Sequence, residues 1–327
     1  MVFSRKDFIG LRGTSADEIH YLLETAETMK IVLGHKNKKA PHLQGKSVIF
    51  LFYDKSSKAK LSYQLAAQYL SASIIDMDPD PQVNSIAEMG QIIDQMGGDF
   101  IVMRHPMAGT SKLLGESAAA SVINAGDGLN ENPSQSLLNL MTIKEEKGRF
   151  DGLKVSIIGD VAHSRVAKSD IWGLCTLGAE VTVAGPPTLI PPNIEDFGVR
   201  VVYDRYEAAS DADVIMALRM QWERQSGNLM PSLAEYRQLF AVDRSMLSYA
   251  KDDVIVMHPG PVNRGIEISS DIIDSDKCLV EDQIANGVAV RMALLYLLSL
   301  GTSKTPGITK EVDFSEGKTS ERKRWLK

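Results

Sequence analysis

Short apolar runs rich in β-branched residues alternate with longer helical patterns along most of this chain, and this alternation limits the folds open to it. The strand-like runs are residues 47–52, 73–77, 100–103, 155–159, 180–184, 199–202, 214–218 and 254–257. The helical patterns are residues 61–70, 86–95, 136–147, 166–176, 234–250 and 283–300. Because strands that alternate with helices pair in parallel and are covered by those helices, the sequence predicts an α/β protein built on parallel sheets.

The length of 327 residues is too great for one ordinary small core and favours two domains. We place the boundary near Asp151, so that residues 1–150 form the first domain and residues 151–282 the second. The apolar segment 283–300 is expected to dock as a helix, and residues 301–327, rich in Ser, Thr, Lys and Glu, are predicted to form a flexible tail.

Charge and composition argue against several functional classes. The formal net charge of −6 is opposite in sign to the surface of a general nucleic-acid binder. Cys175 and Cys278 form no CxxC pair, so we expect no metal site, no disulfide framework and a reducing cytoplasm. No apolar run reaches the ~20 residues of a membrane span, and the N-terminus lacks the apolar core of a signal peptide.

Polar clusters follow most of the predicted strands. They are residues 55–60, 104–105, 127–135, 160–168, 219–224 and 258–264. Because open α/β sheets bind ligands beyond the carboxyl ends of their strands, these clusters together predict a binding cleft more strongly than any one of them does.

The cluster at 55–60 has the residue types that a bound phosphate needs. Ser56, Ser57, Lys58 and Lys60 offer hydroxyls and ammonium groups at the start of a helix, where free backbone N–H groups and the helix dipole favour an anion. An ordinary Ser cap followed by solvated lysines has the same pattern. Arg104 could similarly reach an oxyanion with its fork of donors or form a surface ion pair.

The second half offers partners for a carboxylate. The segment 159–165 follows a strand, but it lacks GxGxxG, and no acidic residue ends the next strand, which argues against a nicotinamide cofactor. Arg165, Arg219 and Gln221 suit a carboxylate substrate. His163 is a candidate acid–base group by its residue type, although a lone His more often has a structural role. The segment 258–267 holds two prolines within four residues and is either a rigid connector or a turn that points carbonyls into the cleft.

Three strings, taken in order, resemble the aspartate/ornithine carbamoyltransferase family, and within it the bacterial aspartate carbamoyltransferase catalytic chains. They are Ala125-Gly-Asp-Gly128, Gly159-Asp-Val-Ala-His-Ser-Arg165 and His258-Pro-Gly-Pro-Val-Asn-Arg-Gly-Ile-Glu267. The resemblance runs from about residue 8 to residue 300. It implies two doubly wound α/β domains, a last helix that packs back on the first domain, and trimers that share active sites between subunits. It also implies transfer of a carbamoyl group from carbamoyl phosphate to an amino acid, without cofactor, metal or covalent intermediate.

On this resemblance, the half of the site that binds the amino acid is complete. Arg165, Arg219 and Gln221 match the residues that hold the carboxylates of aspartate, and Pro259 and Gly260 match the turn near the reacting amine.

The same resemblance assigns three residues on the carbamoyl phosphate side. Asp54 matches an acid that organises arginines across the cleft, Arg104 matches the ligand of the carbamoyl oxygen and phosphate, and Gln135 matches the ligand of the carbamoyl NH2. We therefore expect Arg104, Gln135 and Lys58 to be the catalytic residues.

The carbamoyl phosphate side also departs from the family pattern. Lys58 and Lys60 replace arginines, Ala59 replaces a threonine, Asn132 replaces a histidine, and Gln82 replaces a lysine lent by the neighbouring subunit. A lysine does not reproduce the bidentate fork of arginine. Because losing one oxyanion donor costs about 10²–10³-fold in rate, we expect ordinary carbamoyl transfer to be severely impaired.

Three functions remain open from the sequence. The chain is an aspartate carbamoyltransferase of pyrimidine biosynthesis with an impaired or altered carbamoyl phosphate site. Alternatively, it is a transferase that uses an aspartate-like substrate with a different electrophile. A third possibility is a catalytically inactive paralogue that regulates a partner chain in mixed trimers. Whatever its activity, the chain is expected to form a homotrimer or a hetero-oligomer with a related chain.

Overall fold

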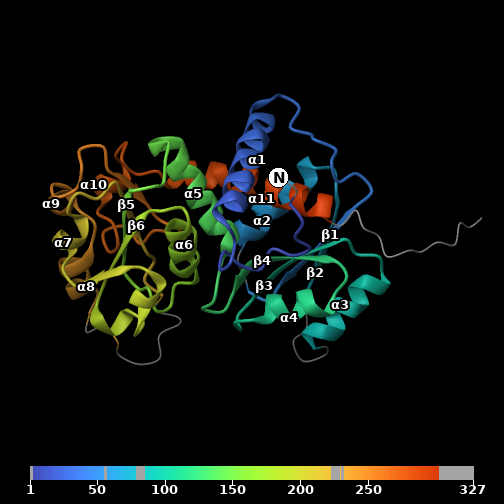
Figure 1. Cartoon of the computed structure of the whole chain (residues 1–327), viewed down its shortest axis with the longest axis horizontal. Coiled ribbons are helices and arrows are strands. Elements are labelled where there is room, and N and C mark those ends of the chain that lie inside the picture. Colours follow the sequence, from blue (N-terminus) through green and yellow to red (C-terminus); the bar gives the residue numbers. More distant parts are fainter. Residues whose placement is uncertain (1–2, 55–56, 79–84, 222–228, 230–231, 302–327) are drawn as a thin grey trace, which may run out of the picture.

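Two parallel sheets lie side by side, each flanked by helices (Figure 1). The computed structural model describes residues 3–54, 57–78, 85–221, 229 and 232–301. The first sheet has the strand order β2-β1-β3-β4 and the second the order β7-β6-β5-β8-β9. Every strand pair in both sheets is parallel. The predicted α/β architecture is therefore confirmed.

The first sheet is built from strands with unequal exposure. Its strands are β1 (Ser47–Phe52), β2 (Ser73–Met77), β3 (Phe100–His105) and β4 (Ser121–Asp127). In β1, Val48 pairs with Ile74 of β2 on one side and with Phe100 of β3 on the other. The central strands β1 and β3 are almost wholly buried apolar runs, as expected for parallel strands covered on both faces. The edge strand β2 is largely exposed.

The helices around the first sheet are α1 (Ala16–Gly34), α2 (Ser57–Tyr69), α3 (Ile86–Gln95), α4 (Thr110–Ser117) and α5 (Pro133–Lys147). The sequence patterns predicted neither the helices α1 and α4 nor the strand β4. Helix α1 carries a capping box in which Ser15 and Glu18 satisfy each other's backbone N–H groups, and this spacing is a readable start signal. Strand β4 is fully buried yet contains Asn124, Gly126 and Asp127, so it lacks the apolar run that marks its neighbours.

The second sheet follows the same plan. Its strands are β5 (Lys154–Ile158), β6 (Glu180–Ala184), β7 (Arg200–Val202), β8 (Val214–Ala217) and β9 (Ile255–Met257). Its helices are α6 (Arg165–Thr176), α7 (Arg205–Ala209), α8 (Leu233–Phe240), α9 (Arg244–Leu247) and α10 (Ser270–Ile273), with short 3-10 turns at Pro187–Leu189 and Ile194–Phe197.

One predicted helix is wrong in its extent. The pattern at 234–250 reads as a single helix, but the structure holds two short helices, α8 and α9, separated by residues 241–243. Val242 is extended there: its N–H donates to the Glu267 carbonyl, and its own carbonyl accepts from Ser269. Asp243 then caps α9 by accepting from the Met246 N–H. Pairing with a distant segment overrides the local helical pattern.

The last helix, α11 (Val280–Gly301), packs against α1, α2 and α5 of the first half, which confirms that it returns to the first domain (Figure 1). Its length and composition alone would allow it to cross a membrane, but 61% of its most apolar 18-residue stretch is buried inside the protein. This burial and the packing against α1, α2 and α5 are those of a core helix. The predicted tail 302–327 lies outside the described residues.

Candidate active site

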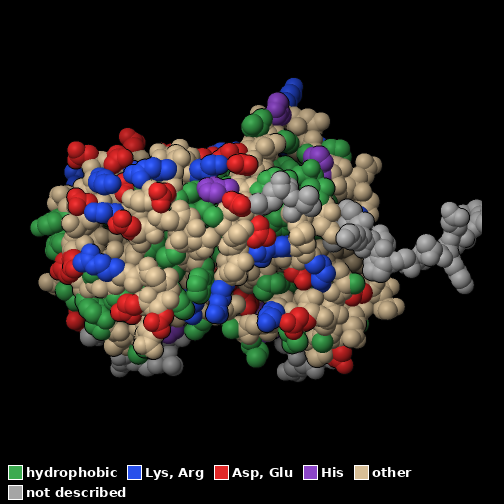
Figure 2. All heavy atoms as spheres, viewed as in Figure 1, with side chains coloured by type: hydrophobic (Ala, Val, Ile, Leu, Met, Phe, Trp, Pro, Cys, Tyr) green, Lys and Arg blue, Asp and Glu red, His purple; other side chains and the backbone are tan. Residues whose placement is uncertain are grey.

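Side chains that follow the carboxyl ends of β1, β3 and β5 come together between the two sheets. Asp54 follows β1, Arg104 lies near the end of β3, and Arg165 opens α6. Arg104 Nε donates to Asp54 Oδ2 at 2.6 Å, and Arg165 approaches the same oxygen at 3.8 Å. The space-filling view shows a hollow between the two lobes, with Lys and Arg side chains at its border (Figure 2). One carboxylate thus holds two guanidinium groups that come from different halves.

Arg165 is placed by the start of its helix and by a glycine. Ser164 caps α6 by accepting from the Ala167 N–H at 3.1 Å. The Arg165 side chain is only 5% exposed. It lies against Gly126, whose φ is +122°, and a Cβ added at Gly126 would come within 2.7 Å of Arg165 Cζ. The glycine therefore leaves the space in which the guanidinium rests.

The start of α2 presents less positive charge to the cleft than the sequence suggests. Lys58 is exposed, whereas the Lys60 Nζ lies 2.6 Å from Asp76 of β2 and 5.8 Å above the Phe52 ring. The Lys60 charge is therefore balanced by an acid of the neighbouring strand. Ala59 is half-buried. Of the other predicted phosphate contacts, Ser56, Gln82 and the side chain of Ser57 lie outside the described residues.

The start of α5 brings Asn132 and Gln135 to the same region. The Asn132 backbone N–H donates to Ser169 Oγ of α6 at 3.0 Å, and the Asn132 side chain makes no capping bond. The side-chain amide of Gln135 donates to Asn139 Oδ1 at 3.4 Å. This bond uses the nitrogen of Gln135 and orients its oxygen away from Asn139, where it can accept a hydrogen bond from a ligand.

The segment after β8, which carries Arg219 and Gln221, is held by two buried carboxylates. Met220 N–H donates to Glu267 Oε1 at 3.0 Å, and Gln221 N–H donates to Asp160 Oδ2 at 3.4 Å. Both acids are essentially inaccessible to solvent. Glu267 and Asp160 were not assigned a role from the sequence, because their partners are backbone groups that are distant along the chain.

His163 is bonded to one of these acids, Asp160. Its Nδ1 lies 2.7 Å from Asp160 Oδ1, and its backbone N–H donates to the same oxygen at 3.2 Å. These two contacts agree with the structural reading of this lone His.

The buried ring of His258 supports the turn at residues 258–260. The Gly260 N–H donates to His258 Nδ1 at 2.8 Å, so the neutral ring carries its proton on Nε2. Burial, assisted by the positive charge of Arg219, lowers the pKa of His258 to about 3. The ring therefore stays neutral in ordinary solution, and Pro259 and Gly260 form a half-exposed turn above it.

Each half of the chain matches a known protein domain. Residues 6–145 match the carbamoyl-P binding domain of aspartate/ornithine carbamoyltransferase, and residues 151–298 match its Asp/Orn binding domain. The chain belongs to the aspartate/ornithine carbamoyltransferase family.

Relatives within this family cover nearly the whole chain. The aspartate carbamoyltransferase catalytic subunit of Acetivibrio thermocellus is 53% identical over 303 residues, which cover 91% of this chain and 97% of that protein. The catalytic subunit of Ruminiclostridium cellulolyticum is also 53% identical, with the same coverage.

Solved structures of the family share the fold. Ornithine carbamoyltransferase from Pyrococcus furiosus superimposes with a TM-score of 0.81 at 28% identity, covering 91% of this chain and 98% of that one. Aspartate transcarbamoylase from Trypanosoma cruzi in complex with N-(phosphonacetyl)-L-aspartic acid gives a TM-score of 0.80 at 26% identity, covering 90% and 97%.

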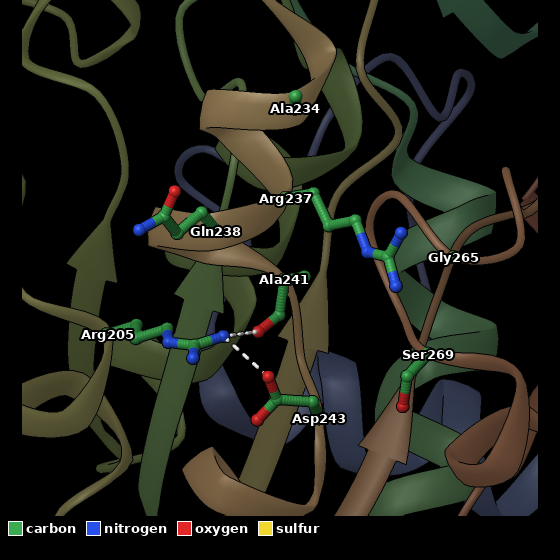
Figure 3. Close-up of a pocket in the computed structure, with 8 residues that line it drawn as sticks. All are labelled: Arg205, Ala234, Arg237, Gln238, Ala241, Asp243, Gly265 and Ser269. Carbon is green, nitrogen blue, oxygen red and sulfur yellow. Dashed lines mark hydrogen bonds and ion pairs between the residues drawn. The ribbon is translucent and has the colours of Figure 1, made fainter.

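A separate surface pocket of about 380 Å³ contains none of the predicted site residues (Figure 3). It is lined by Arg205, Ala234, Arg237, Gln238, Ala241, Asp243, Gly265 and Ser269. Arg205 is already engaged there, because it donates to the Ala241 carbonyl at 2.7 Å and to Asp243 at 2.9 Å (Figure 3). Elsewhere in the described part of the chain, His, Cys, Asp and Glu side chains form no group of three that could hold a metal ion.

Proposed function

We propose that this chain catalyses carbamoyl transfer of the aspartate type, at a rate reduced by changes on the carbamoyl phosphate side of the site. The α-amine of L-aspartate attacks the carbonyl carbon of carbamoyl phosphate, the C–O bond to phosphate breaks, and the amine proton leaves with the phosphate. The products are N-carbamoyl-L-aspartate and phosphate, in the cytoplasm as a step of pyrimidine biosynthesis. The observation that carries this proposal is the 53% identity to aspartate carbamoyltransferase catalytic subunits over 91% of the chain.

The geometry on the aspartate side supports the proposal. Arg165 lies buried at the junction of the halves, held near Asp54. Arg219 and Gln221 follow β8 on a segment that buried acids fix in place. Three side chains that suit two carboxylates are thus held on rigid supports, which lowers the entropic cost of orienting aspartate.

Two residues are proposed to act on the carbamoyl group. Arg104, fixed by its 2.6 Å bond to Asp54 and by donation to the Ala125 carbonyl at 3.2 Å, directs its remaining donors at the carbonyl oxygen that gains negative charge. Gln135 accepts from the carbamoyl NH2 with its side-chain oxygen, the atom left over by its bond to Asn139. The turn of Pro259 and Gly260 is proposed to orient the attacking amine. Positioning and oxyanion stabilisation therefore carry the reaction without a cofactor.

The phosphate end is proposed to be weak. Lys58 and the backbone N–H groups at the start of α2 bind the phosphate, while the ammonium of Lys60 is drawn to Asp76. Ala59 supplies no hydroxyl, and Asn132 offers a neutral amide in place of an imidazole. Each change removes a donor or a charge from the region where phosphate leaves.

The proposal also includes association of three chains. Leu61 of α2 and Ile74 and Ile75 of β2 are apolar and 37% to 57% exposed at one edge of the first half. Exposed apolar side chains along an edge strand suit an interaction surface, and a homotrimer would cover them.

The deciding experiment measures N-carbamoylaspartate formed by the purified chain at saturating carbamoyl phosphate and L-aspartate. We expect turnover well below ordinary enzyme rates, and an increase when Asn132→His and Ala59→Thr restore the donors. Ordinary rates in the unchanged chain would contradict the impairment and leave the transferase proposal standing. No turnover in either chain, together with no binding of aspartate, would overturn the proposal.

The altered phosphate side also supports a second candidate. In it the chain binds aspartate or a similar dicarboxylate but has no turnover of its own, because it uses a different electrophile or regulates an active partner chain. Co-expression with an active catalytic chain tests the regulatory version: mixed oligomers with changed activity would support it. Aspartate binding without any use of carbamoyl phosphate would support a different electrophile.

A further inference from the structure

A series of buried hydrogen bonds, mostly between side-chain amides, links the two halves. It lies next to Gln135 and to the 258–260 turn of the candidate active site. The His258 N–H donates to Gln283 Oε1 at 3.0 Å, and Gln283 Nε2 donates to Asn139 Oδ1 at 2.8 Å. Asn139 Nδ2 in turn donates to both carboxylate oxygens of Asp170, at 3.0 and 3.1 Å. Each of these four residues is at most 2% exposed. Water is therefore excluded as an alternative partner, and the bonds depend on each other.

These hydrogen bonds all have the same donor-to-acceptor direction, from His258 toward Asp170. Each amide donates with its nitrogen and accepts with its oxygen, so the orientation of one fixes the orientation of the next. Burial raises the pKa of Asp170 to about 7, so at pH 8 its carboxylate is ionised, accepts hydrogen bonds and cannot donate, which sets the direction. Gln135 joins the series at the same point, since its Nε2 donates to Asn139 Oδ1 at 3.4 Å. The orientation of the Gln135 amide thus depends on Asn139.

The connected groups belong to four different elements. Gln135 and Asn139 lie on α5 of the first half, Asp170 lies on α6 of the second, and Gln283 lies on α11. His258 precedes the turn proposed to orient the attacking amine. Asn139 is therefore a junction between the residue proposed to bind the carbamoyl NH2 and the turn on the aspartate side.

We propose that Asn139 and Asp170 are positioning residues, which hold the Gln135 amide and the 258–260 turn at a fixed distance and orientation relative to each other. This inference rests on the proposed function for its ligands, whereas the series of hydrogen bonds itself does not depend on it. A ligand that contacts both halves needs these two groups at the correct distance from each other, whereas a ligand that contacts only one half does not.

The test exchanges the two polar groups between the helices. Asn139→Asp alone places two carboxylates against each other in a buried site, where both cannot be ionised cheaply. Asp170→Asn alone sets an amide nitrogen against the Asn139 amide nitrogen, because Asn139 Nδ2 lies within 3.1 Å of both side-chain oxygens of Asp170. Only a flip of the Asn139 amide, which reverses the series of bonds, avoids this contact. In the double variant N139D/D170N the carboxylate at position 139 accepts from Gln283, Gln135 and the amide at position 170. The exchange therefore gives the carboxylate at position 139 a donor on each side.

Two readouts at pH 8 separate positioning from a purely structural role. We expect each single variant to lower the unfolding temperature by about 4 °C or more and to weaken binding of N-(phosphonacetyl)-L-aspartate by roughly 10-fold. Inorganic phosphate, which occupies one half only, should bind within about 2-fold of the unchanged chain. The double variant should recover most of both losses.

Asn286→Ala is the matched control. Asn286 is also a buried amide between α11 and α5, since it donates to Thr142 Oγ1 at 3.0 Å and to Glu145 at 2.7 Å, but it contacts neither Gln135 nor His258 in the bonds described. It should lower the unfolding temperature without changing affinity for the spanning ligand.

Two results would overturn the inference: a double variant no more stable than the single variants predict by addition, or single variants that bind the spanning ligand as tightly as the unchanged chain. An unchanged chain that binds neither phosphate nor N-(phosphonacetyl)-L-aspartate would instead overturn the proposed function. The stability comparison alone would then decide whether the series of hydrogen bonds joins the halves.

Discussion

At the scale of single residues, Gly126 determines where the Arg165 guanidinium can lie. Gly126→Ala should displace Arg165, because the added Cβ would sit 2.7 Å from Cζ and the φ of +122° suits only glycine. We expect the dissociation constant for N-(phosphonacetyl)-L-aspartate to rise roughly 10- to 100-fold, as measured by calorimetry. Gly45→Ala is the control: its φ of +81° is also unusual, but its added Cβ meets nothing within 4 Å. Equal effects of the two changes would mean that backbone strain, and not Arg165, explains the loss.

His258 makes stability depend on pH in a direction that its burial fixes. Its pKa falls from 6.5 in the unfolded chain to about 3 in the folded one, so the unfolded state binds more protons between these values. The stabilisation is therefore complete above pH 6.5 and is lost as the pH falls toward 3. His258→Gln, whose side-chain oxygen can still accept from Gly260, should remove this dependence. Urea midpoints from pH 7 to pH 4 measure it, and parallel profiles for the two proteins would contradict the prediction.

Residue types suggested some of the candidate site residues, and the family resemblance suggested most of the others. Arg165 and Arg219 could be chosen because guanidinium groups after strand ends suit carboxylates. Glu267 and Asp160 could not, because each acts by accepting from backbone N–H groups more than 40 residues away. The local sequence does not distinguish a buried acid that accepts from backbone N–H groups from an acid that is exposed to solvent.

At the scale of elements, the edge strand β2 competes with the start of α2 for the charge of Lys60. Asp76→Asn should release the Lys60 ammonium, and we expect phosphate affinity to rise by about 3-fold at low salt, since exposed pairs contribute little. The gain should shrink in high salt because exposed charges are screened.

The control for this change is Asp76→Asn in a Lys60→Met background. Without the ammonium, the second change should leave phosphate affinity nearly unchanged, as a double-mutant cycle requires. A similar gain in both backgrounds would show that Asp76 repels phosphate directly and that Lys60 takes no part.

The elements that sequence patterns located are those whose own residues decide their conformation. Strands β1 and β3 could be predicted because strands buried on both faces are continuous apolar runs. Strand β4 could not, since its polar residues are satisfied by distant partners: Asn124 donates to the Ile9 carbonyl at 2.8 Å. The break between α8 and α9 likewise depends on the pairing of Val242 with residues 267–269, which local helical periodicity does not report.

At the scale of the whole molecule, the first half is completed by the last helix. The buried side of α11 contributes Ala289, Val290, Met292, Ala293, Leu294, Leu295, Leu297 and Leu298. These side chains belong to the same continuous core as residues of α1, α2 and α5. The chain therefore passes through the second half before it returns to close the core of the first. The apolar composition of residues 283–300 predicted that this helix docks, whereas its return to the first half was predicted only by the family resemblance.

This return makes folding of the first half dependent on α11. A fragment of residues 1–150 should show no cooperative thermal transition by circular dichroism, because the surface that α11 covers would be exposed to water. Joining residues 280–301 to the same fragment through a flexible linker should restore a cooperative transition. Leu294→Asp in the joined helix should abolish it again, since Leu294 is fully buried and a charge there would have no partner. A cooperative transition in the fragment without α11 would show that the first half closes its own core, and that the helix serves to bind the two halves to each other.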